Sequence, residues 1–246
     1  MNIENLTQEE IAQLEAQIKA QKENALKKIQ DDKKIKKALS VSNVMSMKYE
    51  TIPFTGAWLD AFDEPERTGV WIIWGTSGSG KSSFAMMLCE ELCKHGKVLY
   101  NSIEEGTGLS LKSRLERLNI ADMGRRFNVV CEDMDALSKR LLRRRSADFV
   151  VIDSFQHAGI DYHQYLEFRK KHPNKLLVFI SHADGKRPSG RSARSVLFDA
   201  NLKIHVEGFR AKSNGRYIGK NGGIFTIWNE GQWKFWGDNE QLKNND

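Results

Sequence analysis

The sequence has no apolar stretch long enough to cross a membrane. Its longest apolar runs, residues 70–74 and 176–180, fall far short of the ~20 residues that a transmembrane helix needs. The N-terminus, MNIENLTQEE, is polar and acidic and lacks the apolar segment of a secretory signal. We therefore expect a soluble, cytoplasmic protein with no membrane partner.

Cysteine and proline are also scarce. The three cysteines are too few for a disulfide framework. Four prolines and 19 glycines exclude a collagen-like chain and a proline-rich disordered one. Hydrophobic residues make up 40% of the chain, which is enough for a hydrophobic core, and 246 residues allow one sizeable domain plus an appendage. The net charge of +6 is compatible with nucleic-acid binding, but equally with solubility alone.

The chain divides into three predicted parts. Residues 1–48 are a charged N-terminal helix and linker, residues 49–236 form the core, and residues 237–246 are a polar, frayed tail. In the first part, Thr7 and Glu10 have the spacing of a helix capping box, and a narrow apolar stripe follows. This helix either pairs with a partner, such as a neighbouring subunit, or folds back on its own core.

Short apolar runs alternate with amphipathic segments from residue 70 onward, and no internal repeat is evident. This pattern predicts a mainly parallel sheet flanked by helices on both faces. The predicted strands are residues 70–74, 98–103, 127–130, 149–152 and 176–181. The predicted helices are residues 82–94, 109–118, 134–145 and 162–171. After residue 200 we expect antiparallel strands that extend the sheet, at 202–211, 223–228 and 232–236, with a turn at 213–215.

A glycine-rich segment between a strand and a helix matches G-x-x-x-x-G-K-[ST] at every fixed position. Glycines let the backbone curl so that successive N–H groups face phosphate oxygens, and the helix N-terminus adds a favourable partial charge. Lys81 is predicted to reach the β- and γ-phosphates of ATP, and the Ser82 hydroxyl to hold Mg²⁺. The predicted phosphate-binding residues are Gly75, Thr76, Ser77, Gly78, Ser79, Gly80, Lys81, Ser82 and Ser83.

A second acidic element accompanies this loop. The apolar run 149–152 leads directly into Asp153, so one carboxylate lies at the end of a predicted strand. Such a carboxylate can bind Mg²⁺ through water, while the metal bridges the phosphates. We therefore predict that Asp153 and Ser82 form the metal site.

Three further segments resemble RecA-type ATPases of the RadA, KaiC and DnaB branch. The strand 98–105 ends in the paired acids Glu104 and Glu105, FVVIDSFQ at 149–156 is similar to the branch's Walker B strand, and 210–217 is similar to its basic hairpin. The likeness covers about residues 55–228. The chain has one core, no Cys₄ zinc module, no protease-like domain and no DnaB-type helical domain. It is closest to the stand-alone RecA-like ATPases of phages and mobile elements.

The resemblance implies roles for residues outside the phosphate loop. Glu104 is our first choice, and Glu105 our second, for the carboxylate that orients the attacking water. Since successive strand residues point to opposite faces, the two cannot be equivalent. His182 is a candidate γ-phosphate sensor. The resemblance also implies assembly into a hexameric ring or filament, in which hairpin cations act on a neighbour's ATP. These cations are Lys212 and Arg216, with Arg210 as a third candidate.

The segment 183–194 carries four cations and follows the proposed sensor directly. In RecA-like assemblies a loop at this place grips DNA, so we predict a mobile, positive loop that contacts the phosphate backbone of single-stranded DNA. The loop has no aromatic residue for base stacking, so little sequence preference is expected. A solvated loop is the alternative. The predicted DNA-binding residues are Lys186, Arg187, Arg191 and Arg194.

Two other groups of residues have simpler explanations. Cys89 and Cys93, with His95 nearby, lack a fourth zinc ligand and are interpreted as core thiols. A dense aromatic group near the C-terminus is interpreted as packing of the terminal strands, with a base-stacking platform as the alternative. It consists of Phe225, Trp228, Trp233, Phe235 and Trp236.

The sequence therefore predicts a Mg²⁺-dependent RecA-like ATPase that acts on DNA in replication or recombination. The alternative is a nucleotide-gated regulatory or partner-loading ATPase that does not act on DNA. A small-molecule kinase is disfavoured, because it would need a lid and an acceptor pocket and would leave the late basic hairpin without a purpose.

Overall fold

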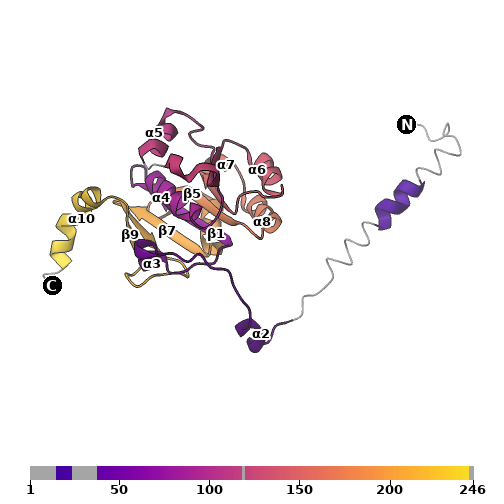
Figure 1. The fold of residues 1–246 in the computed structure, drawn as a ribbon, viewed down its shortest axis with the longest axis horizontal. Coiled ribbons are helices and arrows are strands. Elements are labelled where there is room, and N and C mark those ends of the chain that lie inside the picture. The colour runs from indigo at the N-terminus through magenta and orange to yellow at the C-terminus, as the bar shows by residue number, and fades with distance from the viewer. Residues whose placement is uncertain (1–14, 24–37, 118–119, 244–246) are drawn as a thin grey trace. The chain divides into compact units, whose positions relative to one another are not determined.

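The structure is a computed structural model that describes residues 15–23, 38–117 and 120–243. The chain divides into two units, residues 1–48 and 49–246 (Figure 1). In the first unit residues 15–23 are helical, whereas the predicted capping box at Thr7 and Glu10 lies outside the described residues. A short helix, α2 (Val41–Met45), begins with a capping box in which Ser40 and Asn43 exchange backbone-to-side-chain hydrogen bonds, both of 3.2 Å.

The described part of the second unit is built on a nine-stranded sheet in the order β3-β2-β4-β5-β1-β7-β8-β9, with β6 paired to β5. In this order, neighbouring strands are parallel from β3 through β2, β4, β5 and β1 to β7. β8 and β9 continue the sheet antiparallel, and β6 is antiparallel to β5. The strands are β1 (Gly69–Gly75), β2 (Val98–Ser102), β3 (Phe127–Val130), β4 (Phe149–Asp153), β5 (Leu176–Asp184), β6 (Arg187–Pro188), β7 (Leu202–Glu207), β8 (Arg210–Ser213) and β9 (Ile224–Thr226).

Helices cover both faces of this sheet, as the continuous apolar strands require (Figure 1). Trp71 and Ile73 of β1 face a core shared with α3, α4 and α5, whereas Val70, Ile72 and Trp74 face a core shared with α6 to α9. The helices are α3 (Gly56–Phe62), α4 (Lys81–Cys93), α5 (Leu109–Arg117), η2 (Ile120–Arg126), α6 (Met134–Leu141), α7 (Phe155–Ala158), α8 (Tyr162–Lys171), α9 (Arg191–Asp199) and α10 (Asn229–Lys243).

The predicted fold class is confirmed: a mainly parallel α/β sheet, flanking helices and an antiparallel C-terminal extension. The five predicted parallel strands and four predicted helices are all present, with ends that differ by a few residues. Among the described residues no helix is both long and apolar enough to span a bilayer.

The predicted strand at 202–211 is wrong, because the chain turns in its middle. β7 ends at Glu207 and β8 begins at Arg210, and the two residues between them both have positive φ, 51° at Gly208 and 59° at Phe209. A side chain at Gly208 would also clash with the rings of Phe235 and Trp236. The hairpin turn therefore lies here, whereas the residues after Ser213 form a longer loop to β9.

The predicted strand at 232–236 is also wrong, and the predicted frayed tail is helical up to its last described residue. Both segments belong to α10 (Asn229–Lys243). Two contacts attach this segment to the β7–β8 turn: the indole N–H of Trp236 in α10 donates to the Gly208 carbonyl at 3.1 Å, and the ring of Trp228, the residue before α10, meets the Phe209 ring edge to face. Trp236 of the aromatic group thus packs on the hairpin turn from a helix, whereas Phe225 lies on β9 and packs against Trp58, Phe62 and Phe84.

The predicted loop at 183–194 is instead a β-hairpin followed by the first turn of a helix. β5 continues to Asp184, a turn at Gly185 (φ 59°) leads into β6, and α9 begins at Arg191. The Trp74 indole donates to the Lys186 carbonyl at 3.2 Å, and the Ser189 N–H donates to the His182 carbonyl at 2.8 Å. These hydrogen bonds attach the segment to β1 and β5, whereas its glycines and serines had suggested an irregular loop.

The three cysteines occupy two environments. Cys89 and Cys93 are buried on α4 in the core, whereas Cys131 is exposed after β3. Burial raises the pKa of Cys93 to about 11 and that of Cys89 well above its usual value. Since the thiolate is the reactive form, both buried thiols are doubly protected, by access and by protonation.

We expect the native protein to react with a colourless disulfide reagent at Cys131 alone, and at all three cysteines after denaturation. Absorbance of the released thiolate would count the reactive groups in each state. The control variant Cys131→Ser should show no fast reaction when folded. If Cys89 or Cys93 reacted as fast as Cys131, the packing of α4 against the sheet would be wrong.

Candidate nucleotide site

The glycine-rich segment forms the connection between β1 and α4. Gly78 (φ 74°) and Gly80 (φ 102°) adopt positive φ, which brings the backbone around to the first turn of the helix. Gly75 lies so close to β7 that a Cβ there would clash with the Val206 carbonyl oxygen. The glycines therefore serve the curvature of the loop and its close packing on the sheet, and the N–H groups of the α4 N-terminus remain available for phosphate.

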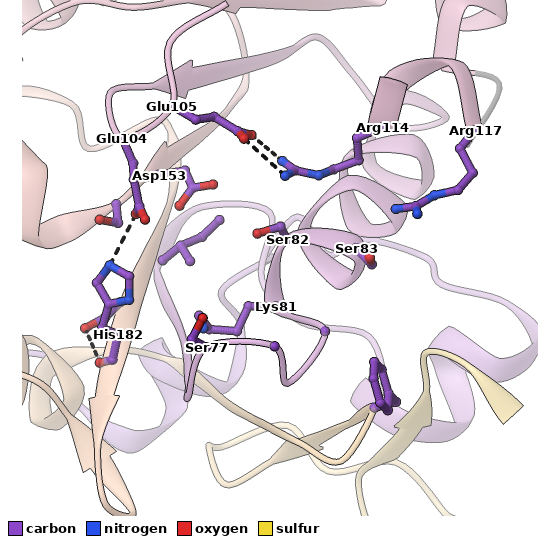
Figure 2. A pocket seen from close by; sticks show the side chains of 16 residues that line it. Ser77, Lys81, Ser82, Ser83, Glu104, Glu105, Arg114, Arg117, Asp153 and His182 are labelled. Atoms are coloured by element: carbon purple, nitrogen blue, oxygen red, sulfur yellow. Dashed lines mark hydrogen bonds and ion pairs between the residues drawn. The ribbon is translucent and has the colours of Figure 1, made fainter. Parts of the chain in front are cut away.

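This loop borders a cavity of about 430 Å³ at the carboxyl ends of the parallel strands. The side chains that converge on it come from β4, β5, α4, α5 and the turn after β2 (Figure 2). The predicted residues that line it are Ser77, Gly78, Gly80, Lys81, Ser82, Ser83, Glu104, Glu105, Asp153 and His182. A predicted phosphate loop and predicted acids that are distant in the sequence thus share one cavity.

Lys81 lies in the first turn of α4 and points along the loop. Its Nζ donates to the Thr76 carbonyl at 2.7 Å, so the ammonium spans the base of the loop (Figure 2). Burial lowers the pKa of Lys81, and the nearby carboxylates of Asp153 and Glu104 act in the opposite direction. A phosphate entering the cavity would compensate the desolvation of this cation.

Asp153 ends β4 and is only 7% exposed. The Tyr100 hydroxyl of neighbouring β2 donates a hydrogen bond to its carboxylate. Burial raises the pKa of Asp153, and the bond from Tyr100 partly offsets that effect. Asp153 and Ser82 line the same cavity and offer a carboxylate and a hydroxyl oxygen, which is the hard-oxygen donor chemistry that Mg²⁺ prefers. These two residues therefore fit the metal that the phosphate loop implies.

The two acids of the predicted pair have different partners. Glu104 Oε2 lies 3.3 Å from His182 Nε2, whereas Glu105 is held by the Arg114 guanidinium and by the Ser110 hydroxyl at 2.9 Å (Figure 2). We predicted both acids on the strand, but β2 ends at Ser102 and both lie in the turn that follows it. The two acids therefore differ in environment because they have different partners, and not because successive strand residues point to opposite faces. Glu104 is the acid without a guanidinium partner among its described contacts.

His182 is positioned by a side chain of α7. Gln156 accepts a hydrogen bond from the His182 N–H at 3.1 Å. Its amide also donates to Ser181 Oγ at 2.8 Å and to the Ser189 carbonyl at 2.9 Å. Gln156 therefore links the segment after β4 to the end of β5 and fixes the backbone from which the imidazole reaches Glu104.

Several lining residues were missed by the sequence analysis. Arg114 and Arg117 extend from α5 to the cavity (Figure 2). Phe209 of the β7–β8 turn also lines it. The two arginines are spaced i, i+3, which places them on one face of a helix. The sequence could therefore have indicated that they point in the same direction. Phe209 carried no such signal. Its N–H donates to the Ser79 carbonyl at 3.2 Å, which attaches the turn to the phosphate loop.

The predicted hairpin cations do not line the cavity of their own chain. Lys212 is exposed on β8, where its backbone pairs with His205 of β7, and Arg216 is exposed in the loop that follows. The Arg210 guanidinium lies over the Trp236 ring, 5.3 Å from its centroid. Arg210 thus has a packing role at the turn, whereas the role of Lys212 and Arg216 in trans stays a prediction.

The predicted DNA-binding cations lie on the β5–β6 hairpin and the first turn of α9. Lys186, Arg187 and Arg191 are exposed. Arg194 is half-buried and makes an ion pair of 2.7 Å with Asp184 as well as a hydrogen bond to the Pro188 carbonyl. Three of the four predicted cations therefore face solvent, and Arg194 stabilises the hairpin.

The comparisons with known proteins agree with this geometry. Residues 65–161 match the family model described as an AAA domain, which covers β1, the phosphate loop and β4. A search of the curated proteins finds no match.

Two solved structures have the same fold at 14% sequence identity, and each covers 73% of this chain. One is the flagellar accessory protein FlaH from Methanocaldococcus jannaschii, with a TM-score of 0.53 and 92% of that chain covered. The other is the KaiC-like protein PH0186 from Pyrococcus horikoshii OT3, with a TM-score of 0.50 and 98% covered. The chain therefore has the RecA-like P-loop ATPase fold, as predicted.

Proposed function

We propose that this protein binds ATP with Mg²⁺ and hydrolyses it. The observation that carries the proposal is the convergence of Lys81, Ser82, Asp153 and Glu104 on one cavity beside the phosphate loop. Each supplies a different requirement of phosphoryl transfer to water: a cation for the phosphates, two oxygens for the metal, and a carboxylate for the nucleophile.

The chain's own groups divide the chemistry among them. Lys81 exchanges its bond to the Thr76 carbonyl for the β- and γ-phosphates, while loop amides bind the remaining phosphate oxygens. Ser82 and Asp153 would hold Mg²⁺, which neutralises charge on the phosphates when it is bound. Glu104 orients a water for attack and accepts its proton, and His182 contacts both this acid and the γ-phosphate region.

We further propose that single-stranded DNA is the macromolecule on which this ATPase acts, in replication or recombination. Support comes from the exposed cations Lys186, Arg187 and Arg191 next to the predicted sensor strand. α9 also presents Phe198, which is 78% exposed and lies two turns after Arg191 on the same helix face. An exposed aromatic ring near cations is suited to stack on a base while the cations bind the phosphate backbone. The predicted DNA-binding segment, residues 183–194, contains no aromatic residue of its own.

The end of α9 is firmly attached, which makes this surface rigid. Asp199 accepts hydrogen bonds from the Tyr165 hydroxyl and from the Arg169 guanidinium of α8, the latter at 2.6 Å. Phe198 therefore stays exposed on a fixed helix and not on a loose end. This rigidity supports α9 as a binding surface, because a preordered surface loses less entropy on binding.

We propose that subunits assemble in a ring or filament in which Lys212 and Arg216 complete a neighbour's site. Both are exposed and neither lines the cavity of its own chain, which is compatible with a role in trans. A cation supplied by another subunit would stabilise the charge that develops on the transferred phosphoryl group. Hydrolysis would then depend on assembly.

A regulatory or partner-loading ATPase without DNA action is the second candidate. The observation that favours it is the similarity to FlaH, whose description is that of an accessory protein. In this case ATP would control assembly with a protein partner, and the surface of α9 would bind that partner.

One experiment separates the two candidates. We expect the ATPase rate per subunit to rise with single-stranded DNA at low salt, and to fall on dilution below the assembly range. Phe198→Ala should reduce the stimulation by DNA and leave the basal rate unchanged, because Phe198 is not among the residues that line the nucleotide cavity. Leu142→Ala is a matched control, since Leu142 is also exposed, at 67%, on a different helix end.

A rate unaffected by DNA, together with no DNA binding at low salt, would exclude DNA action and favour the regulatory candidate. A rate per subunit that stays constant on dilution would exclude the role of Lys212 and Arg216 in trans. Absence of hydrolysis under all conditions would exclude the proposed activity itself.

A further inference from the structure

Three potential metal ligands from separate elements meet at one end of the cavity. Glu104 follows β2, His157 lies on α7, and His182 lies on β5. Glu104 Oε2 is 3.3 Å from His182 Nε2 and 3.5 Å from His157 Nδ1. One ligand atom from each residue lies within 4.8 Å of the others, which is the one such group of three in the described part of the chain.

These separations are close to those of a metal-bound set. With metal–nitrogen and metal–oxygen distances of about 2.0–2.2 Å, neighbouring ligands of a tetrahedral ion are roughly 3.3–3.5 Å apart. The two distances from Glu104 already have these values. The His157 and His182 rings, with centroids 6.4 Å apart, flank the carboxylate, so small side-chain rotations would complete the geometry.

The donor set differs from that of the predicted Mg²⁺ site. Imidazole suits zinc and the neighbouring transition metals, whereas Mg²⁺ prefers oxygen ligands and retains its waters. Ser82 and Asp153 offer oxygen alone, but this group offers two ring nitrogens and one carboxylate. The cavity is therefore bordered by two groups of side chains that suit different metals, since Ser82 and Asp153 as well as Glu104 and His182 line it.

The group is accessible and leaves a coordination position open. The side chains of Glu104, His157 and His182 are 35%, 48% and 40% exposed. Glu104 and His182 both line the cavity, so the fourth position of a tetrahedral ion would face its water. Binding has one local cost: His157 Nδ1 is 2.9 Å from Ser154 Oγ, and this hydrogen bond would have to break before Nδ1 could bind the ion.

We propose that Glu104, His157 and His182 bind a divalent transition-metal ion, with zinc as the leading case, and that the bound ion inhibits the ATPase. The ion would occupy the carboxylate that otherwise accepts a proton from the attacking water. The binding site stands on its own geometry, whereas the inhibition rests on the proposed function. No bond is made or broken in this step apart from coordination.

The test is a titration of the full chain, free of nucleotide, with Co²⁺ as a spectroscopic substitute for zinc. We expect visible absorption bands of tetrahedral cobalt that saturate at one ion per chain and disappear when zinc is added. Mg²⁺ in excess should not displace the ion. Since loss of groups that merely support a metal ligand costs about 10–100-fold in affinity, His157→Ala and His182→Ala should each weaken binding at least about tenfold.

His163→Ala is the matched control, because His163 is exposed on α8 outside the cluster and should leave cobalt affinity unchanged. Unchanged affinity in both cluster variants would overturn the site. An intense sulfur-to-cobalt band in the near ultraviolet would also overturn it, because that band would place the ion on a cysteine.

A second readout tests the inhibition separately. With Mg²⁺ present, zinc should inhibit ATP hydrolysis by the wild type. The zinc concentration for half inhibition, measured against each protein's own zinc-free rate, should be at least about tenfold higher for His157→Ala than for the wild type. Cobalt binding without inhibition would overturn the inhibitory role and keep the site. Absence of hydrolysis by the zinc-free wild type in the presence of Mg²⁺ would overturn the proposed function, while the cobalt titration would still decide whether the site exists.

Discussion

Glu104→Gln should bind ATP as well as the wild type and hydrolyse it about 10²–10⁴-fold more slowly, which is the range that a positioned general base contributes. The amide has the shape of the carboxylate but cannot accept the proton of the attacking water. Glu104 is favoured for this role because it lies in the cavity beside His182, without the guanidinium partner that holds Glu105. Phosphate release would report hydrolysis, and calorimetry would report ATP affinity.

Two variants control this prediction. Glu116→Gln changes an exposed acid on α5 and should leave both quantities unchanged. Glu105→Gln removes the ion pair to Arg114 and should have a smaller effect on turnover than Glu104→Gln. If Glu105→Gln abolished hydrolysis while Glu104→Gln turned over normally, the two assignments would be reversed.

Lys81→Ala should weaken ATP binding by about 10–150-fold, because a hydrogen bond to a charged group contributes about 1.5–3 kcal/mol. Turnover should fall by a further factor of about 10²–10³, as expected when one electrostatic donor to the transition state is removed. Lys81 is half-buried, and burial lowers its pKa, so its ammonium is desolvated in the free protein and compensated by phosphate only on binding. Calorimetry and phosphate release would measure the two losses.

The fold should survive this substitution, because the Lys81 ammonium makes one hydrogen bond among those described, to the Thr76 carbonyl. A melting temperature close to that of the wild type would show that the loss is local. Lys112→Ala is the matched control, since it removes an exposed lysine of α5 that is paired loosely with Glu116 at 3.7 Å. ATP binding by Lys81→Ala at wild-type affinity would contradict the assignment of the phosphate loop.

The parallel core was predictable because its signals are local. Each strand buried on both faces appears as an unbroken apolar run, and β3 and α8 have the predicted ends, Phe127–Val130 and Tyr162–Lys171. The predictions of secondary structure fail where contacts between distant parts of the chain accompany the observed helix. Trp233, Phe235 and their neighbours have the alternation of a strand, but they lie in the helix α10. Trp236 of this helix contacts Gly208, and Trp228 just before it contacts Phe209, both in a turn that is distant in the sequence.

The same limit applies to the segment after β5. Its arginines, glycines and serines are typical of a solvated loop, yet Ala193 and Val196 are buried with helical spacing and belong to α9. The attachment of Asp199 to Tyr165 and Arg169 of α8 holds that helix in place. These partners are distant in the sequence, so no local pattern indicated them.

Contiguous residues alone determined the phosphate loop, since its glycines set a local backbone path and its lysine and serine follow at fixed positions. The tertiary structure decided which acid of the pair can act, and which side chains accompany it. Glu104 meets His157 and His182 only because β2, β4 and β5 are neighbours in the sheet, and Glu105 meets Arg114 only because α5 folds back over the cavity. Such meetings depend on strand order and helix packing, which residues adjacent in the sequence do not encode.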